Sequence, residues 1–300
     1  MSAPPVSVIM RAKNSDWVIG QALAGLYSQS FRDFELLVVD SGSTDRTLEI
    51  VRAYPHRLIE IEAGDYYPGK VLNLAIEQAR GGLIVFLNSD AVPLGPHTLA
   101  RLLAAFDDPE VVGAFARQLP RPEAESWVRR DYALSFPASG EAPPWMGLSL
   151  PLAAIRKDTW RRHPFYTDAW GSEDTEWGIW AKRQGLKIRY VPQATVMHSH
   201  NYTLRQIYGR RFIEGEADAF IYRDRDGIAR MFTRYVASVG RDVAWHVRCG
   251  DWLGLAKSPV RRAVYQWAYY KGHKLGERRI AEGDDDAGIG QRTVLSRYEK

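Results

Sequence analysis

The sequence predicts an α/β fold: an open, mostly parallel sheet flanked by helices, followed by a helical C-terminal extension. Short apolar runs alternate with helical patterns over the first hundred residues, as they do in repeated β-α-β units. The runs 36–39 and 83–87 are apolar throughout, which is typical of parallel strands that helices cover on both faces. From Thr203 onward the pattern is mostly helical, so the C-terminal region is expected to lie outside the sheet.

Capping residues and glycines set the expected helix boundaries, and the remaining apolar runs are expected to be strands. Asp16 and the Ser43-Thr44 pair can each cap a helix, and Gly69 opens a helix with apolar residues at helical spacing. In chain order, the expected strands span 6–10, 36–39, 58–61, 83–87, 111–116, 147–155, 187–191 and 194–198. The expected helices span 16–28, 44–53, 69–80, 96–105, 126–133 and 173–184.

The composition excludes several classes of protein. The 300 residues are 45% hydrophobic and 25% charged, which excludes a disordered or fibrous chain. The net charge of +4 is too small to indicate binding to nucleic acid, and we expect none. Cys249 is the only cysteine, which fits a reducing compartment. No apolar run approaches the ~20 residues of a membrane span, so we expect a cytoplasmic protein.

The length suggests about two structural units. We expect an α/β domain over 1–204, a helical region over 205–280 and a disordered tail over 281–300. The segment 240–280 is basic and rich in tryptophan and tyrosine, which makes it a candidate for peripheral contact with the inner face of a membrane. The alternative is a packed helix whose basic side is solvated.

Two aspartates end the two buried strands and are the first candidate site residues. Asp40 can accept a hydrogen bond from the imide N–H of uracil or thymine, whereas Asp45 or Ser43 in the following loop would serve as caps. Asp90 can bind Mg²⁺ or Mn²⁺, whose other ligands would be water and diphosphate oxygens; the alternative is a turn aspartate. Lys70 follows a glycine at a helix start and can meet the diphosphate, or it can be a solvated lysine.

Acids, tryptophans and histidines of the segment 170–200 form a second candidate group. Asp174 lies between Trp170 and Trp177, so it can act as a general base whose pKa is somewhat raised, while the indole rings can stack on a sugar. Adjacent acids at a helix start can also simply favour the helix dipole. His198 and His200 alternate directly after a strand and point to the same side, which favours a metal site.

In their order along the chain, these segments resemble the family 2 glycosyltransferases with a GT-A fold. The resemblance covers residues 5–205 and rests on the motifs Val6-Ser7-Val8-Ile9-Met10-Arg11-Ala12-Lys13-Asn14, Val38-Val39-Asp40-Ser41-Gly42-Ser43-Thr44-Asp45, Asn88-Ser89-Asp90 and Glu173-Asp174. The stretch from Tyr190-Val191-Pro192 to His198-Ser199-His200-Asn201-Tyr202 is similar to the subgroup of bacterial rhamnosyltransferases.

The resemblance implies a role for each matching residue. It implies nucleotide binding by Arg11, Ala12, Asp40, Lys70, Asn73, Asn88 and Ser89. It also implies metal binding by Asp90 and His198, with His200 as a competitor, and a catalytic base at Asp174 beside Glu173. Asn88 departs from the family's Asp-x-Asp pattern, which puts the strength of metal binding in doubt. Trp170 and Trp177 are added from their position beside the base.

The implied activity is an inverting, metal-dependent sugar transfer in bacterial cell-surface polysaccharide biosynthesis. The donor would be a nucleoside-diphosphate sugar, either dTDP-rhamnose or a UDP-hexose, and Mg²⁺ or Mn²⁺ would be the cofactor. The acceptor would be a glycan or a lipid-linked molecule. The alternatives are a nucleotide-sugar-binding module without catalytic activity and, as a weaker candidate, a sugar-1-phosphate nucleotidyltransferase.

Overall fold

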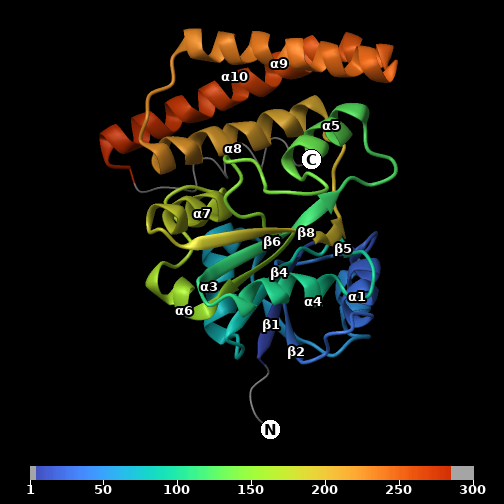
Figure 1. The fold of residues 1–300 in the computed structure, drawn as a ribbon. Coiled ribbons are helices and arrows are strands. Elements are labelled where there is room, and N and C mark those ends of the chain that lie inside the picture. Colours follow the sequence, from blue (N-terminus) through green and yellow to red (C-terminus); the bar gives the residue numbers. More distant parts are fainter. Residues whose placement is uncertain (1–4, 285–300) are drawn as a thin grey trace. The chain divides into compact units, whose positions relative to one another are not determined.

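The computed structural model describes residues 5–284, which divide into two compact units (Figure 1). The first unit comprises the chain up to 122 together with 132–165 and 173–199. The second comprises 123–131, 166–172 and the chain from 200 onward. Two short segments that we expected inside an α/β domain over 1–204 therefore group with the helical region.

An eight-stranded mixed sheet organises the first unit, in the order β3-β2-β1-β4-β7-β6-β8-β5. Four of the seven strand pairings are parallel and three are antiparallel, as expected for an open, mostly parallel sheet. The strands are β1 (Val6–Ala12), β2 (Phe34–Asp40), β3 (Arg57–Glu60), β4 (Leu83–Leu87), β5 (Val92–Pro93), β6 (Val111–Leu119), β7 (Leu152–Arg156) and β8 (Lys187–Met197).

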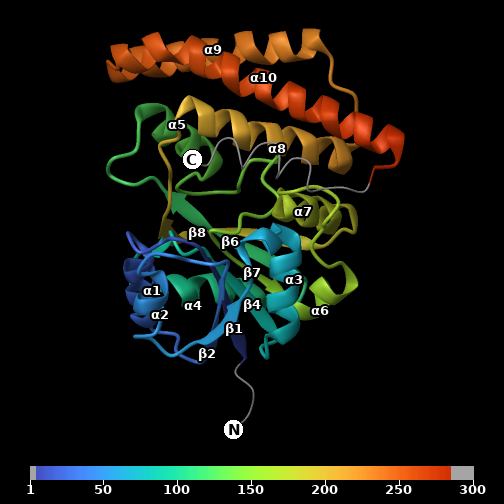
Figure 2. The ribbon, with the colours of Figure 1, turned by 180° about the vertical axis from the view of Figure 1, so that it is seen from behind.

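Helices cover both faces of this sheet, and each face has its own apolar core (Figures 1 and 2). Alternate residues of a strand point to opposite faces, so Val8 and Met10 of β1 enter one core and Ile9 enters the other. The flanking helices are α1 (Ile19–Tyr27), α2 (Thr47–Val51), α3 (Pro68–Gln78), α4 (Thr98–Leu103), α6 (Lys157–Arg162) and α7 (Glu173–Arg183). The short helix α5 (Ser126–Ser135) crosses the boundary between the two units.

Local details differ from the expected boundaries at several places. β7 begins at Leu152 rather than at 147, the short strand β5 was not expected, and α2 has Arg46 as its N-cap rather than Ser43 or Thr44. The strands expected at 187–191 and 194–198 form one strand, β8, whose pairing with β6 shifts register near Arg117. The short helix α6 was not expected, because six residues are too few for a visible apolar period. Asp16 does not cap α1; its backbone N–H instead donates to the Asp45 carboxylate at 3.0 Å.

The second unit is built on three long helices: α8 (Leu204–Tyr222), α9 (Ile228–Cys249) and α10 (Trp252–Glu282). Thr203 caps α8 through a capping box with Gln206. α10 packs against both other helices. Its contact with α8 is closest at Gly272, where an added Cβ would overlap the Phe212 carbonyl oxygen. Within residues 5–284, no helix is both long and apolar enough to cross a membrane.

Many charges of the segment 240–280 lie inside the second unit rather than on its surface. Arg262 is 5% exposed, and its guanidinium pairs with Asp242 at 2.7 Å. Arg261 is buried against Glu125, and Arg279 is buried against Glu216. Most of the expected tail over 281–300 lies outside the described residues, although α10 continues to Glu282.

Candidate active site

Three neighbouring parallel strands bring the first group of predicted residues to one edge of the sheet. β1 ends at Ala12, β2 ends at Asp40, and β4 ends directly before Asn88. β1 lies between β2 and β4. In open α/β sheets, ligands bind in the crevice outside the carboxyl ends of the strands, so this edge is the place for a nucleotide site.

The Asp40 carboxylate holds the loop that follows it. Oδ2 accepts hydrogen bonds from the backbone N–H groups of Gly42 and Ser43, at 3.0 and 2.8 Å, and Oδ1 accepts one from the Ser43 hydroxyl. Gly42 has a φ of +79°, which glycine adopts without strain. Asp40 is only 2% exposed. Asp40 ends β2 and does not cap α2, whose N-cap is Arg46. Its recognition of a base stays a prediction.

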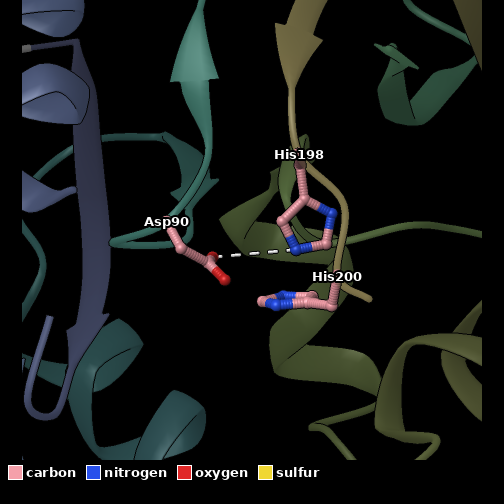
Figure 3. A group of neighbouring side chains, drawn as sticks. All are labelled: Asp90, His198 and His200. Atoms are coloured by element: carbon pink, nitrogen blue, oxygen red, sulfur yellow. Dashed lines mark ion pairs between the residues drawn. The ribbon is translucent and has the colours of Figure 1, made fainter. Parts of the chain in front are cut away.

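Asp90, His198 and His200 form a group that could hold a metal ion. Figure 3 shows their side chains directed toward one another, Asp90 from the loop after β4 and the two histidines from the segment after β8. One ligand atom from each lies within 4.8 Å of the other two. Asp90 Oδ1 is 3.7 Å from His198 Nε2. His200 begins the last segment of the second unit, and it stays near His198 because only one residue separates them in the chain.

The other nitrogen of His198 has a defined partner. Nδ1 lies 2.8 Å from Gln118 Oε1, and the Gln118 amide nitrogen donates to Ser149 Oγ at 2.7 Å. Because Oε1 can only accept, Nδ1 carries the proton and Nε2 presents its lone pair toward Asp90. This is the arrangement by which outer residues orient a metal-binding histidine. Gln118 was not among the predicted site residues, since no local pattern distinguishes it.

Arg121 connects the two segments that carry the metal-binding candidates. Its Nη2 donates to the Asp90 carbonyl oxygen at 2.7 Å, and its backbone N–H donates to Ser199 Oγ at 2.9 Å. The side chain is 7% exposed and its guanidinium lies over the ring of Trp17. Arg121 thus places a cation beside the Asp90 turn. Arg121 was not among the predicted site residues, because it follows a strand and lies in no recognisable motif.

Arg11 and Glu173 form an ion pair that joins the end of β1 to the start of α7. Arg11 Nη1 lies 3.0 Å from Glu173 Oε1, and both side chains are largely buried. Burial by itself lowers the pKa of Arg11, but the neighbouring Tyr66 and Glu173 raise it by more, so the guanidinium stays charged. The side chain of Arg11 thus contacts the expected catalytic pair, and its place in a base pocket stays a prediction.

The Asp174 carboxyl group has a pKa well above its ordinary value. Burial raises its pKa, the negative charge of Glu173 raises it further, and together they bring it to about 6. Hydrogen bonding by the Thr175 backbone N–H, at 2.8 Å, and the charge of Arg11 oppose the increase. A carboxyl group with a pKa near the working pH can both take up and release a proton, which suits a general base.

The other predicted nucleotide-binding residues divide into exposed and structural ones. Lys70 is exposed in the first turn of α3, and its ammonium lies 5.1 Å from the Tyr67 ring. Ser89 bonds to the Ser15 hydroxyl at 2.9 Å, next to Asn88. Asn73 holds the fold: its side chain donates to the Phe165 carbonyl and accepts from Phe165 N–H and the Trp160 indole. A nucleotide role for Asn73 stays a prediction.

The two tryptophans beside Asp174 differ in their surroundings. Trp177 is 0% exposed, its indole N–H donates to the His163 carbonyl, and it packs in the core against Phe165 and Trp180. It has no free face for a sugar ring, so the expected stacking was wrong for Trp177. Helical spacing alone does not distinguish a core indole from a binding one. Trp170 groups with the second unit, and its stacking stays a prediction.

Sequence comparison identifies relatives that span most of this chain. It is 29% identical over 267 residues to an O-antigen chain rhamnosyltransferase, WbaN, of Salmonella anatum, covering 83% of this chain and 81% of the relative. It is 26% identical over 291 residues to the O-antigen chain rhamnosyltransferase RfbN of Salmonella typhimurium, covering 91% and 89%.

Solved structures with the same fold include a mannosyltransferase and the protein TarS. The mannosyltransferase PcManGT of Pyrobaculum calidifontis, in complex with GDP-Man and Mn²⁺, aligns with a TM-score of 0.65 at 20% identity, covering 93% of this chain and 88% of its own. TarS of S. aureus in complex with UDP aligns with a TM-score of 0.53 at 18% identity, covering 95% and 92%. At these identities the likeness concerns the fold, which is the expected GT-A type.

The family comparison covers more than half of the chain. The family described as Glycosyl transferase family 2 matches residues 7–164, which include β1, the Asp40 loop and the Asp90 turn. The motifs, the sheet topology and the relatives all agree with this match. The protein therefore belongs to glycosyltransferase family 2.

Proposed function

We propose that the protein is an inverting glycosyltransferase in which Asp174 is the general base. The observation that carries the proposal is a half-buried carboxyl group whose pKa is raised to about 6, at the start of a helix anchored by the Arg11–Glu173 ion pair. The substrates would be a nucleoside-diphosphate sugar and an acceptor with a free hydroxyl group. Inversion follows from a single displacement, because the acceptor oxygen attacks the face opposite the leaving group.

Asp174 would remove the proton from the acceptor hydroxyl as its oxygen attacks the anomeric carbon. The oxygen forms the new glycosidic bond, and the bond between that carbon and the diphosphate oxygen breaks with its electron pair. General base assistance of this kind contributes ~10²–10⁴-fold to the rate. Glu173 would act as a positioning residue, because its charge raises the pKa of Asp174 and its bond to Arg11 anchors the helix start.

The Asp90 group fits a divalent cation by its donor chemistry. It offers a carboxylate and the lone pair of His198 Nε2, with the tautomer set by Gln118. A mixed oxygen and imidazole donor set suits Mn²⁺ better than Mg²⁺, which prefers oxygen ligands alone. Such an ion supplies charge neutralisation for the departing diphosphate. Lys70, exposed at the start of α3, would add a cation on the diphosphate side.

For the donor we propose dTDP-rhamnose first and a UDP-hexose second. The two Salmonella relatives are named as O-antigen chain rhamnosyltransferases and span most of this chain, which supports rhamnose. A structural neighbour of the same fold is in complex with UDP-GlcNAc and another with GDP-Man, so the fold itself accommodates several nucleotides. The acceptor would be a growing glycan or a lipid-linked sugar of the bacterial cell surface.

A donor screen and one variant test the reaction. Purified protein is incubated with dTDP-rhamnose, UDP-glucose or GDP-mannose, with Mn²⁺, Mg²⁺ or EDTA, and the released nucleoside diphosphate is measured. We expect release with one of the first two donors, and its loss in Asp174→Asn while binding of the nucleoside diphosphate is retained. Unchanged transfer by Asp174→Asn would remove the proposed mechanism.

Asn88 favours a second candidate, a nucleotide-sugar-binding module without catalytic activity. It stands where the family pattern has an aspartate, and a neutral amide binds a hard cation less strongly than a carboxylate. This candidate predicts nucleotide binding without turnover for every donor and acceptor in the screen. Release of pyrophosphate instead of a nucleoside diphosphate would indicate a nucleotidyltransferase.

A further inference from the structure

Helices α9 and α10 carry an exposed apolar face in the second unit. Nine large apolar side chains between 228 and 267 are at least 41% exposed. They are Ile228, Phe232, Val236, Val243 and Val247 on α9 and Trp252, Leu253, Val260 and Trp267 on α10. We call this set the apolar face. Single exposed apolar residues are ordinary, but a set of this size marks an interaction surface.

The spacing of these residues places them on one side of each helix. On α9 they are separated by four, four, seven and four residues, and on α10 Leu253, Val260 and Trp267 are separated by seven. At 3.6 residues per turn, such spacings keep side chains on one stripe. The buried residues of α9, Ser238, Asp242 and His246, are spaced four apart and lie on a neighbouring side of the helix. α9 is therefore an amphipathic helix whose apolar side faces solvent rather than the core.

The exposed charges on the two helices that carry the apolar face have one sign. Between 228 and 276, all exposed charged residues are cations: Arg230, Arg241, Arg248, Lys257 and Lys271. Of the two acids in this stretch, Asp242 is 1% exposed and Asp251 pairs with His246. Arg248 precedes Trp252 and Leu253 in the chain, and Lys257 follows them.

We propose that the apolar face docks on an anionic lipid surface, with Trp252 and Leu253, the first two residues of α10, as its principal contacts. Tryptophan is favoured at the boundary between headgroups and acyl chains, and amphipathic helices with basic residues lie in that boundary. A second copy of this chain is a poorer occupant. Packing one face against itself would bring cations of the same sign together, at a cost to the contact.

This surface overlaps the basic, aromatic stretch over 240–280 that the sequence suggested, but only part of that stretch contributes to it. Arg261, Arg262 and Arg279 of that stretch are buried in ion pairs, and Tyr269 donates to Asp218 inside the helical unit. The apolar face starts at Ile228, before that stretch begins. The proposal also goes beyond sugar transfer, since lipid binding is measured without donor or acceptor.

Vesicle binding of the full chain tests the proposal. The protein is co-sedimented with vesicles of phosphatidylcholine alone or of phosphatidylcholine with phosphatidylglycerol. We expect binding to the anionic vesicles that weakens with added salt, and much less binding to the neutral ones. The double variant Trp252→Ser with Leu253→Ser should weaken binding about tenfold or more, because two large apolar side chains are lost from the contact.

A matched pair of exposed residues in the first unit serves as the control. Trp145 is 67% exposed and Leu134 is 53% exposed, close to the values of 66% and 65% for Trp252 and Leu253. The double variant Trp145→Ser with Leu134→Ser should bind vesicles like the parent. All variants are first compared by circular dichroism and nucleotide binding, which should not change, so that loss of the fold or of the nucleotide site is recognised.

The charges are tested in the same way. Replacing Arg248 and Lys257 by Gln should weaken binding to anionic vesicles about 25-fold, since each cation near such a surface contributes about fivefold. Replacing the exposed Arg52 and Arg183 of the first unit by Gln should change binding less than about threefold. Equal binding to neutral and anionic vesicles, absence of binding, or a dimer that the Trp252 and Leu253 variant dissociates would each overturn the proposal.

Discussion

Asp174→Asn is expected to stabilise the protein while it abolishes transfer. The folded-state pKa of Asp174 is raised from 3.8 to about 6, because burial and the charge of Glu173 disfavour its ionised form. The folded state therefore holds a proton that the unfolded state releases more readily. Stability is lost as pH rises from about 4 to about 6, and at neutral pH the full cost of ionising Asp174 is present.

The magnitude follows from the size of that pKa difference. About two units correspond to about 3 kcal/mol, at 1.36 kcal/mol per unit. Asparagine has nearly the same shape and can still accept the bond from the Thr175 N–H, so the substitution removes the charge without removing this contact. An increase of about 3 kcal/mol in the free energy of unfolding corresponds to a higher Tm by roughly 6–10 °C for a domain of this size.

Denaturation at two pH values measures this effect. Unfolding of the parent and of Asp174→Asn is compared at pH 7.5 and at pH 4.0, with Asp158→Asn as a control because the Asp158 side chain is 87% exposed. We expect the full stabilisation at pH 7.5 and less than about 1 kcal/mol at pH 4.0, which lies well below the folded-state pKa of Asp174 and close to its unfolded-state value of 3.8. A difference that is absent at pH 7.5, or equal at the two values, would refute the assignment of a raised pKa to Asp174.

Four further outcomes are expected. Glu173→Gln removes the negative charge beside Asp174, so the acidic limb of the pH profile of kcat/KM should move to lower pH by about one unit; an unmoved limb would contradict the coupling. Arg121→Met removes the bond to the Asp90 carbonyl and should weaken Mn²⁺ binding about tenfold or more, as measured by electron paramagnetic resonance titration without substrate. Gly272→Ala should destabilise the protein by about 1–3 kcal/mol in denaturant unfolding, because its Cβ would meet a backbone oxygen. Gly240→Ala, on an open side of α9, should instead stabilise by up to about 1 kcal/mol.

The sheet could be predicted from the sequence, and so could the edge that carries the residues predicted to bind the nucleotide. Apolar runs such as 83–87 are local signals, because a strand covered on both faces must be apolar at every position. The position of Asp40 and Asp90 at strand ends follows from the same runs. The division into two units was harder to predict from the sequence. Residues 123–131 group with helices more than a hundred residues away, through pairs such as Arg130 with Asp242 at 2.9 Å.

Residues with the same local pattern acquired different roles in the folded protein. Trp170 and Trp177 look equivalent in the sequence, but Trp177 is completely buried beneath the sheet. Asn73 lies in a motif of the family, yet its amide is used by Phe165 and Trp160. Composition and spacing indicate which side chains are present. Burial and hydrogen-bond partners determine which of these side chains can still contact a ligand.

The sequence by itself determined the fold class, the family and the order of the acid and histidine motifs, because these depend on neighbouring residues along the chain. Only the tertiary structure decided the partners of the site. The Arg11–Glu173 pair joins residues 162 positions apart, and Arg121 reaches the Asp90 carbonyl across 31. Such contacts depend on how strands and helices pack, and no periodic pattern in the sequence indicates them. The exposed side of α9 likewise emerged only once the helices had been placed against one another within their unit.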